Sequence, residues 1–464
     1  MVFSSLAFLW MFLPIVFAGY FVVPEKAKNI FLLLGSLFFY AWGEPKYILL
    51  MLASILIHYA IGILMEKFEA KKKAFLILAI FINIGLLGYF KYFNFLIEIL
   101  NQCAKRNLPS PGVPLPIGIS FFTFQILSYV IDLYRGQYKA QKSLIRLALY
   151  ISFFPQLIAG PIVQYKDMDS QLAHRVCTAE KTAWGIRRFI YGLGKKVIIS
   201  NTVAQCVDMI YGLDYADVTG GLAWIAAILY TLQIYYDFSG YSDMAIGLGK
   251  MFGFEFRENF HYPYLSSSIQ EFWQRWHISL GTWFKEYLYI PMGGNRKGEL
   301  RTSIHLLLVF FLTGLWHGAS FNFILWGLYH GMFQVVERLG FKKILARHKA
   351  AAYGYTITVS VFGWVLFRAD NLHQAGVMVK RMLLPWRYVE TSLIMGKVFG
   401  NKTIFIIVAG ILGCGFIQSV LGKAQLLEKG KNSYWEMVYC GAIFVLCIAM
   451  LASNTYNPFI YFRF

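Results

Sequence analysis

The chain has 464 residues, of which 58% are hydrophobic and only 14% are charged, and its mean hydropathy is +0.53. Soluble domains carry about 25% charged residues, so this composition excludes an ordinary soluble protein and indicates one that crosses a membrane several times. The formal charge of +19 does not indicate a nucleic-acid-binding protein, because no polar module is present to offer a basic face. Lys and Arg are instead typical of the cytoplasmic loops of membrane proteins.

The cysteines show neither paired CxxC spacing nor a compact framework, and the sequence contains no HExxH pattern. We therefore expect no metal site and no disulfide scaffold. The simplest interpretation is that all six are small apolar packing residues: Cys103, Cys177, Cys206, Cys414, Cys440 and Cys447.

Crossing a bilayer takes about 20 mainly apolar residues in a helix. The first apolar run has no basic residues before it and continues past Pro14 to Val23, so we interpret it as a crossing rather than a cleaved signal peptide. The candidate crossings in chain order are 4–23, 28–43, 46–66, 74–98, 116–134, 186–211, 220–238, 302–318, 320–340, 353–369, 402–421 and 435–452. The sequence predicts an all-α polytopic membrane protein with about 11–12 transmembrane helices, in one membrane domain over residues 1–464.

The basic loops predict the orientation of the chain. If the crossings alternate, one side of the membrane receives the basic stretches 25–28, 67–73, 166–196, 295–297, 342–349 and 423–431. Because cytoplasmic loops carry the excess of Lys and Arg, this side should be the cytoplasm. We therefore expect the N-terminus on the outside.

Two apolar regions do not fit a straight crossing. Residues 150–161 contain Pro155 and end in Ala159-Gly160-Pro161, which disfavours a continuous helix. Residues 268–292 are amphipathic rather than uniformly apolar. Partly inserted backbone is stable at membrane depth only when it is buried in protein or lines a cavity. Both regions predict re-entrant or interfacial helices around a central cavity or tunnel.

A helical projection of residues 270–288 groups the aromatic side chains on one arc of about 160°, with Ile278 as the one misfit. The segment is one amphipathic helix, or two joined at Ser279-Leu280-Gly281. His277 is the only strongly ionisable residue within the aromatic arc. The helix could be an interfacial anchor and the histidine a packed residue bonded to a backbone carbonyl, or the helix could direct an imidazole into a cavity.

His317 follows an apolar run and precedes Gly318. The helical rise from His305 to His317 is only about 18 Å, which places His317 at membrane depth. A buried neutral imidazole is a suitable general base, and Gly314 and Gly318 would let a substrate or a neighbouring helix approach closely. The alternative is a histidine that forms a hydrogen bond between helices.

Other polar groups lie at the ends of apolar segments. Asp237 and Asp243 could orient a histidine, pair with Arg275 or bind a polar substrate, and structural pairing is the simpler role. The stretch from Gly293 to Asn295 and Arg296 is rich in glycine and basic residues. It could contact a phosphate group, although an ordinary cytoplasmic turn explains it as well.

Several of these segments together resemble the membrane-bound O-acyltransferase family, in particular its bacterial alginate O-acetylation branch. The matching motifs occur in the same order in both: residues 116–125, 159–163 and 237–245, Arg275-Trp276-His277, residues 289–296, Trp316-His317-Gly318 and Asn457-Pro458-Phe459. They divide the chain into N-terminal spans, 1–115, and a motif-bearing core, 116–464. The related branch that D-alanylates teichoic acid is similar at both Trp-His segments but not at Gly293–Arg296, which favours the acetylating branch.

The resemblance implies a polysaccharide O-acetyltransferase in the bacterial inner membrane. It implies acetyl-CoA or another acetyl thioester as the cytoplasmic donor, an extracytoplasmic polysaccharide as the acceptor, and an exported acetyltransferase as a partner. His317 corresponds to the family's essential histidine and would be the base. His277 would position the donor or share proton transfer, and Arg275, Trp276, Trp316, Asp237, Asp243, Asn295 and Arg296 are the candidate binding residues.

The charges of the cytoplasmic loops place His277 toward the cytoplasm, so we expect the two histidines to be separate stations on one path. Three alternatives remain open: transfer of D-alanyl or another acyl group to a cell-wall polymer, a polysaccharide transporter, and a scaffold for an exported enzyme. Against a transporter, the sequence shows no inverted repeat.

Overall fold

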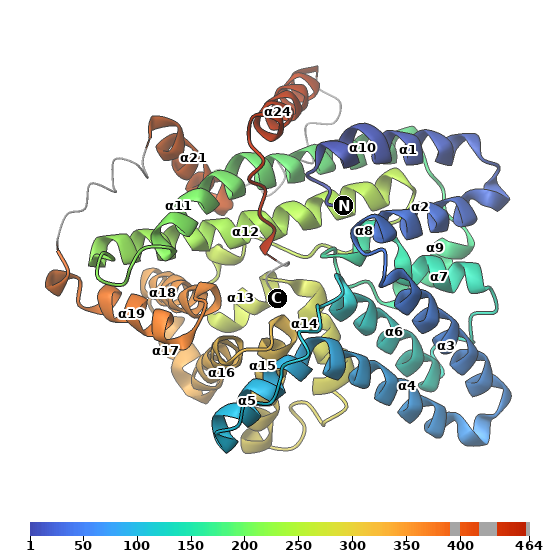
Figure 1. Ribbon diagram of the computed structural model, residues 1–464, viewed down its shortest axis with the longest axis horizontal. Helices are drawn as coiled ribbons and strands as arrows, with labels where there is room; N and C mark the ends of the chain where they lie inside the picture. The colour runs from blue at the N-terminus through green and yellow to red at the C-terminus, as the bar shows by residue number, and fades with distance from the viewer. Residues whose placement is uncertain (390–399, 417–433, 461–464) are drawn as a thin grey trace. The chain divides into compact units, whose positions relative to one another are not determined.

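The computed structural model describes residues 1–389, 400–416 and 434–460, and every regular element in these ranges is a helix. Figure 1 labels the helices along the chain. Five helices are long and apolar enough to cross a membrane: Ile48–Lys67, Glu69–Ala104, Glu299–His317, Lys349–Arg368 and Tyr434–Ser453. Three shorter helices are also apolar: Phe8–Val22, Ile119–Tyr134 and Asn401–Gly415. The all-α polytopic fold is therefore confirmed, while the total of about 11–12 crossings stays a prediction.

Contacts divide the chain into two compact units. The first contains residues 1–189 and 242–257, and the second contains residues 190–241 and 258–464. The division falls within two helices, α10 (Ala179–Gly194) and α12 (Gly220–Met251). Both candidate histidines belong to the second unit.

The first unit carries helices with much apolar surface on the outside, as expected for contact with lipid. Its α3, α4 and α6 lie side by side (Figure 1), and Phe81 on α4 has 74% of its surface exposed. The region around Pro155 is broken as predicted, since α7 ends at Ser152 and only a short helix follows. The elements are α1 (Leu13–Val22), α2 (Lys28–Gly43), α3 (Ile48–Lys67), α4 (Lys72–Leu87), α5 (Phe93–Ala104), α6 (Ile119–Tyr134), α7 (Leu144–Ser152), α8 (Phe154–Leu157), α9 (Tyr165–Ala173) and the start of α10 (Ala179–Gly194).

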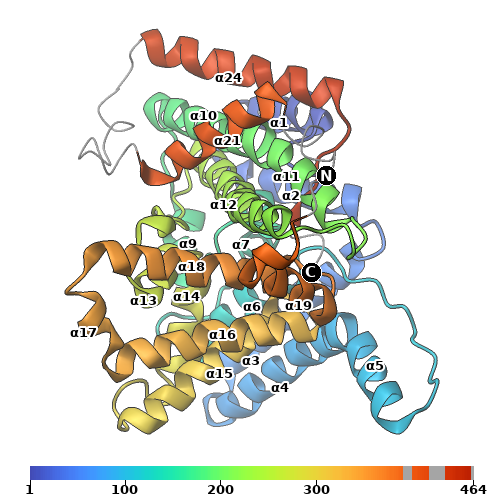
Figure 2. The same cartoon turned by 90° about the vertical axis from the view of Figure 1, so that its left-hand side faces the viewer.

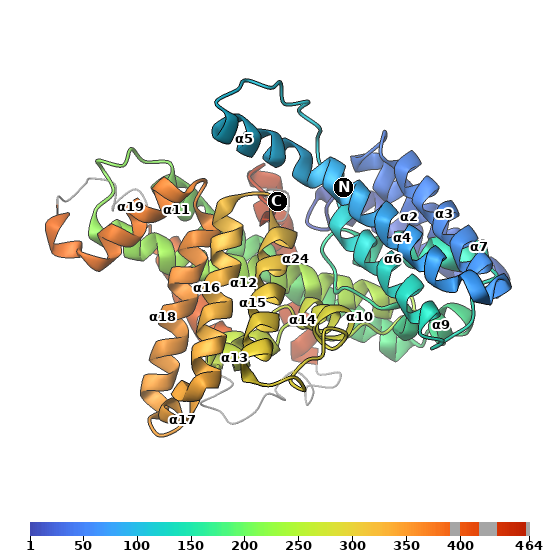
Figure 3. The ribbon, with the colours of Figure 1, turned by 90° about the horizontal axis from the view of Figure 1, so that it is seen from below.

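The second unit is built around a helical hairpin. Helices α15 and α16 pack along their length, with α18 against α16, and Figures 2 and 3 show the three side by side. The elements are η5 (Lys195–Ser200), α11 (Asn201–Tyr211), α12 (Gly220–Met251), α13 (Ile269–Arg275), α14 (Ile278–Phe284), η7 (Lys285–Tyr289), α15 (Glu299–His317), α16 (Phe321–Val336), η8 (Glu337–Phe341), α17 (Lys342–Leu345), α18 (Lys349–Arg368), α19 (Leu372–Leu383), α21 (Asn401–Ile411), η10 (Leu412–Phe416) and α24 (Tyr434–Ser453). The predicted crossing 402–421 and the basic loop 423–431 extend beyond the described residues.

Glycines explain how closely the hairpin packs. A Cβ atom on Gly314 would lie 2.2 Å from the carbonyl oxygen of Phe323, and one on Gly327 would lie 2.2 Å from that of Phe310. No side chain fits at either distance, so these positions require glycine. The predicted close approach at Gly314 is therefore made by a neighbouring helix.

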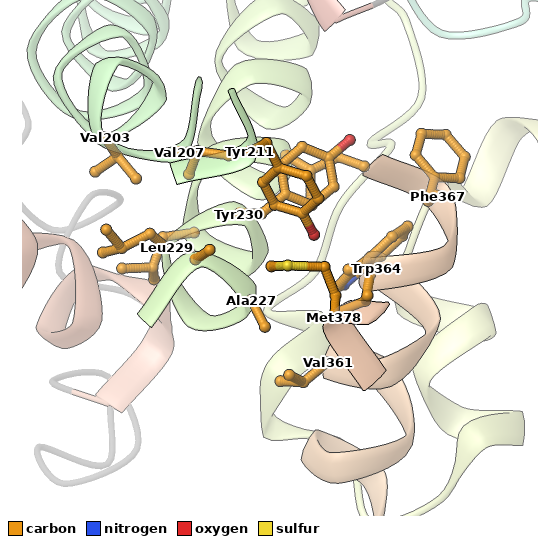
Figure 4. Packing of buried hydrophobic residues seen from close by; sticks show 14 of the residues in the cluster. Val203, Val207, Tyr211, Ala227, Leu229, Tyr230, Val361, Trp364, Phe367 and Met378 are labelled. Atoms are coloured by element: carbon orange, nitrogen blue, oxygen red, sulfur yellow. The ribbon is translucent and has the colours of Figure 1, made fainter. Parts of the chain in front are cut away.

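A large apolar cluster fills the second unit beside this hairpin. It joins side chains of α11, α12, α18 and α19, and Figure 4 shows part of it. Trp364 and Phe367 on α18 belong to this cluster and also reach the pocket described next. Rigid aromatic packing of this kind holds the walls of a site in place.

Candidate active site

His277 lies at a break between two short helices. Helix α13 ends at Arg275, Trp276 is extended, and His277 has φ 46° and ψ 53° before α14 begins at Ile278. The left-handed conformation costs a non-glycine residue about 1–2 kcal/mol, so surrounding contacts must hold it. The break corrects the predicted junction at Ser279–Gly281, and it explains why Ile278 did not fit a continuous projection.

The N-terminal end of α13 is fixed by polar contacts. At its start the Ser268 hydroxyl accepts a hydrogen bond from the Glu271 N–H at 3.1 Å. The buried Glu337 carboxylate accepts from the N–H groups of Ile269 and Gln270 at 2.5 and 2.9 Å. A negative charge at a helix N-terminus is favourable. These contacts tie α13 to the end of the α15–α16 hairpin.

Asn259 holds the imidazole of His277 in one tautomer. The Asn259 Oδ1 atom accepts hydrogen bonds from the Ser279 N–H at 3.1 Å and from the Ser279 hydroxyl at 2.9 Å. Because a backbone N–H can only donate, this side-chain atom must be the oxygen, and His277 Nδ1, 3.2 Å away, must carry its proton. Nε2 is then the basic nitrogen, and it has no hydrogen-bond partner among the described residues.

Burial keeps His277 neutral. The side chain is 1% exposed, and desolvation lowers its pKa from 6.5 to about 3. It belongs to neither of the flanking seven-residue helices, which are too short to cross a membrane. A neutral imidazole with one free lone pair can accept a proton or a hydrogen bond from a bound molecule.

His317 is the last residue of α15, directly before extended Gly318. It is 5% exposed and its ring lies 5.1 Å from the ring of Trp326 and 5.2 Å from that of Phe367. A Cβ atom on Gly318 would lie 2.2 Å from the Phe323 ring. The glycine after His317 is therefore required for the hairpin to close behind the imidazole.

The two histidines share one site. Their ring centroids are 6.5 Å apart, and Trp316 contacts both rings, at 5.8 Å from His277 and 4.9 Å from His317. A direct hydrogen bond needs donor and acceptor near 3 Å, which this separation does not allow. The expectation that the two histidines occupy separate places along one path is therefore corrected. The distance between their rings leaves space for about one small reacting group.

An apolar pocket adjoins His317. Its volume is about 10 Å³, close to the space that one water molecule requires. The predicted hollow interior is thus nearly closed at this point, and a substrate must displace side chains to enter. The pocket is lined by Ile234, Phe238, Trp276, His317, Trp326, Trp364, Phe367 and Ile460.

Three of the charged candidate residues form ion pairs with other side chains. Asp237 is buried and pairs with Lys196, and Asp243, in the first unit, pairs with Arg188 at 2.7 Å. Arg275 pairs instead with Glu271, at 2.6 Å. The two carboxylates thus have the structural pairing that the sequence favoured, although not with Arg275.

Asn295 and Arg296 are exposed and lie in a turn that begins at Gly293 and Gly294, both with positive φ. This is the ordinary turn that the sequence allowed. Asn295 nevertheless lines a second, polar cavity of about 590 Å³, together with Gln270, Tyr289, Arg338, Lys342 and Lys343 among others. No group of three or more His, Cys, Asp or Glu side chains in the described ranges is arranged to hold a metal ion.

Sequence reasoning missed Asn259, Lys196 and His330. Asn259 stands 18 positions before His277 in a loop without a motif, so only the fold reveals its contact. Lys196 left a signal, since a lysine beside the apolar residues 197–199 needs a partner. His330 is fully buried and makes edge-to-face contacts with Trp273 and Trp326, with ring centroids 5.1 and 5.4 Å away.

Comparison with known proteins identifies a family and several similar proteins. The model of the membrane-bound O-acyltransferase family matches residues 135–367. The chain is 40% identical to the probable alginate O-acetylase AlgI of Pseudomonas putida, with 100% of both chains covered. It is 37% identical to the peptidoglycan O-acetyltransferase of Helicobacter pylori over 82% of this chain and 80% of that protein. It is 30% identical to the teichoic acid D-alanyltransferase of Bacillus subtilis over 47% and 57% respectively.

The two histidine segments lie inside the matched region, in a polytopic helical chain. The relatives transfer acyl groups, as their names state. This chain is a multi-pass membrane acyltransferase, and it belongs to the membrane-bound O-acyltransferase family.

Proposed function

We propose that this protein passes an acetyl group from a cytoplasmic thioester to an extracytoplasmic polysaccharide. The observation that carries the proposal is the pair of buried imidazoles with ring centroids 6.5 Å apart, surrounded by apolar side chains. A site that excludes water protects the thioester from hydrolysis and strengthens electrostatic interactions inside it. Two imidazole side chains in such a site suit acyl transfer to a hydroxyl group.

In the proposed reaction, His317 removes the proton from the acceptor hydroxyl as its oxygen attacks the thioester carbonyl carbon. The new C–O bond forms, the C–S bond breaks, and the departing thiolate receives the proton from His317. His277, with Nδ1–H bonded to Asn259, offers Nε2 to the reacting groups and positions the donor or shares the proton transfer. General acid–base catalysis of this kind contributes about 10²–10⁴-fold to a rate.

The polar cavity supports a donor that carries phosphate groups, such as acetyl-CoA. Arg338, Lys342 and Lys343 give it positive charge, and the only acidic lining residue, Glu337, is occupied by the N-terminus of α13. The cavity reaches Leu306 on α15, eleven residues before His317, which is about 17 Å of helix. An extended peptide-like arm of roughly thirteen bonds, such as pantetheine, spans about 15 Å. This length is close to the distance along α15 between the cavity and His317.

The names of the relatives support the choice of acceptor. Their names include alginate and peptidoglycan acetylation, so we propose an exopolysaccharide or another extracytoplasmic glycan as the acceptor. The acetyl group would reach it directly or through an exported acetyltransferase. We place the protein in the bacterial inner membrane with its N-terminus outside, on the strength of the basic loops.

A deletion strain tests the function. We expect it to export its polysaccharide at normal yield but without acetyl groups, and wild-type protein to restore acetylation. His317→Ala should not restore it, whereas His305→Ala, the same change on the same helix, should. Loss of polymer export on deletion would contradict an acyltransferase role, and full rescue by His317→Ala would reduce the protein to a scaffold.

The similarity to teichoic acid D-alanyltransferase favours D-alanyl transfer as the second candidate. The modified polymer distinguishes the two functions. Mass spectrometry of polymer from the rescued strain should detect ester-linked acetyl groups, and ester-linked D-alanine in their place would overturn the acetyl assignment.

A further inference from the structure

A segment without regular structure follows α24 and becomes buried at Phe459 and Ile460. After α24, residues 454–459 form no regular structure, and Figure 1 shows the segment leaving α24 and passing α12. Phe459 and Ile460 are 7% and 6% exposed. Some interaction must hold this segment inside the second unit.

A buried ion pair provides that interaction. Lys196 on η5 and Asp237 on α12 are 2% and 1% exposed and in contact. The Lys196 ammonium also donates to the carbonyl oxygen of Pro458, and the Ile460 N–H donates to Asp237 at 2.9 Å. A buried ion pair is tolerated only when its remaining hydrogen-bonding capacity is used. Here the backbone of the C-terminal segment uses it, so the pair and the segment stabilise each other.

Side chains on both sides extend this attachment. Asn201 donates to the side-chain oxygen of Asn457 at 3.0 Å, and the rings of Tyr241 and Phe459 are 4.7 Å apart. The segment is therefore fixed at Asn457, Pro458, Phe459 and Ile460 in succession. These contacts fix the position of the Ile460 side chain.

Ile460 lines the pocket beside His317. Most of the other walls are aromatic rings packed on one another, for example Trp276 on Trp364 at 4.7 Å and Trp326 on Phe367 at 4.9 Å. Ile460 is carried by the segment after α24 and Trp276 lies between α13 and α14, whereas the other lining residues belong to α12, α15, α16 and α18. With about 10 Å³ of free space, the pocket holds about one water molecule, so each further carbon of an acyl group must displace a lining side chain.

We propose that Ile460, held by the Lys196–Asp237 pair, limits the size of the acyl group that this enzyme transfers. The proposal rests on the proposed function, in which the acyl carbonyl reacts beside His317. Its physical basis is that Ile460 occupies space that the second and third carbons of a longer acyl chain would need. One extra methylene against a fixed apolar wall is worth about 10–200-fold in discrimination.

The test compares acetyl-CoA, propionyl-CoA and butyryl-CoA as donors for the full-length protein in lipid nanodiscs, with a polysaccharide fragment as acceptor. Ile460→Ala removes three carbon atoms from the wall. It should raise the propionyl-to-acetyl ratio of kcat/KM by about tenfold, and Ile460→Val should raise it less. Ile210→Ala is the matched control, because Ile210 is fully buried in the same apolar cluster but does not line the pocket. It should leave the ratio unchanged.

A second substitution tests whether the Lys196–Asp237 pair holds Ile460 in place. Asp237→Asn keeps the side-chain volume but removes the charge that holds Lys196, so it should shift the donor ratio in the same direction as Ile460→Ala. A merely structural effect would lower transfer from all donors alike. An unchanged ratio in Ile460→Ala and Ile460→Val, or an equal shift in Ile210→Ala, would overturn the proposal. Wild-type protein that transfers no acyl group from any donor would instead overturn the proposed function.

Discussion

Asn259→Ala should separate the catalytic role of His277 from its packing. The change removes one oxygen that accepts three hydrogen bonds, two from Ser279 and one from His277. It leaves intact the bond from the Ile278 N–H to the Asn259 carbonyl, at 3.0 Å, so the chain path is retained.

The magnitude follows from these contacts. Each neutral hydrogen bond contributes about 0.5–1.5 kcal/mol, so the loss of three costs about 2–4 kcal/mol of stability. His277 also loses the group that fixes its tautomer and ring orientation. If the fixed orientation of His277 lowers the free energy of the transition state by about 1.4–2.8 kcal/mol, its loss reduces kcat by about 10- to 100-fold.

The assay is steady-state acetyl transfer by purified full-length protein, alongside its melting temperature. Asn83→Ala is the matched control, because Asn83 is a buried asparagine in the first unit that lies 2.7 Å from another histidine, His58. It should lower the melting temperature to a similar extent while leaving kcat near wild type. An unchanged kcat in Asn259→Ala, or an equal loss in Asn83→Ala, would refute the assigned role of Asn259.

Three further predictions follow. Because burial lowers the pKa of His277 to about 3 from the ordinary 6.5 of the unfolded chain, protons bind the unfolded state preferentially below pH 6.5. Stability should therefore fall by up to about 1.4 kcal/mol per pH unit from pH 6.5 toward 3, and His277→Gln should flatten this dependence in melting curves. Replacing Arg338 and Lys342 together by Ala should raise KM for acetyl-CoA about tenfold without changing KM for acetyl-pantetheine, and an equal change for both donors would count against a phosphate site. Gly314→Ala should destabilise the protein by about 1–3 kcal/mol, because its Cβ would lie 2.2 Å from a backbone oxygen of α16, whereas Gly354→Ala, with nothing within 4 Å, should not.

The fold class could be predicted because it depends on composition. Long apolar segments with few charges leave membrane helices as the only arrangement that satisfies the backbone. The break near Pro155 was also predictable, since proline removes a hydrogen-bond donor and restricts its neighbour. The number of crossings is harder to predict, because several helices are shorter than a bilayer and their apolar faces pack against protein.

The site was predictable only in part. His277 and His317 stood out as ionisable residues in apolar surroundings, and Trp276 and Trp316 came with them. Their distance in space could not be predicted, because it depends on how the break at His277 and the α15–α16 hairpin pack together.

Long-range contacts explain the remaining misses. Asn259, Lys196 and Ile460 act through partners elsewhere in the chain, and no local pattern identifies those partners. Lys196 is informative in retrospect, since a charge among apolar residues predicts a partner without saying which.

The most direct test of the account is the rate of acetyl transfer by His317→Ala in purified, full-length protein. The account predicts a loss of about 10²–10⁴-fold in kcat, the range expected for a general base, with normal folding and an unchanged KM for the donor. His305→Ala, measured beside it, should keep nearly all of its activity. A His317→Ala enzyme that transfers acetyl groups at the wild-type rate would contradict the central claim that the paired imidazoles carry the reaction.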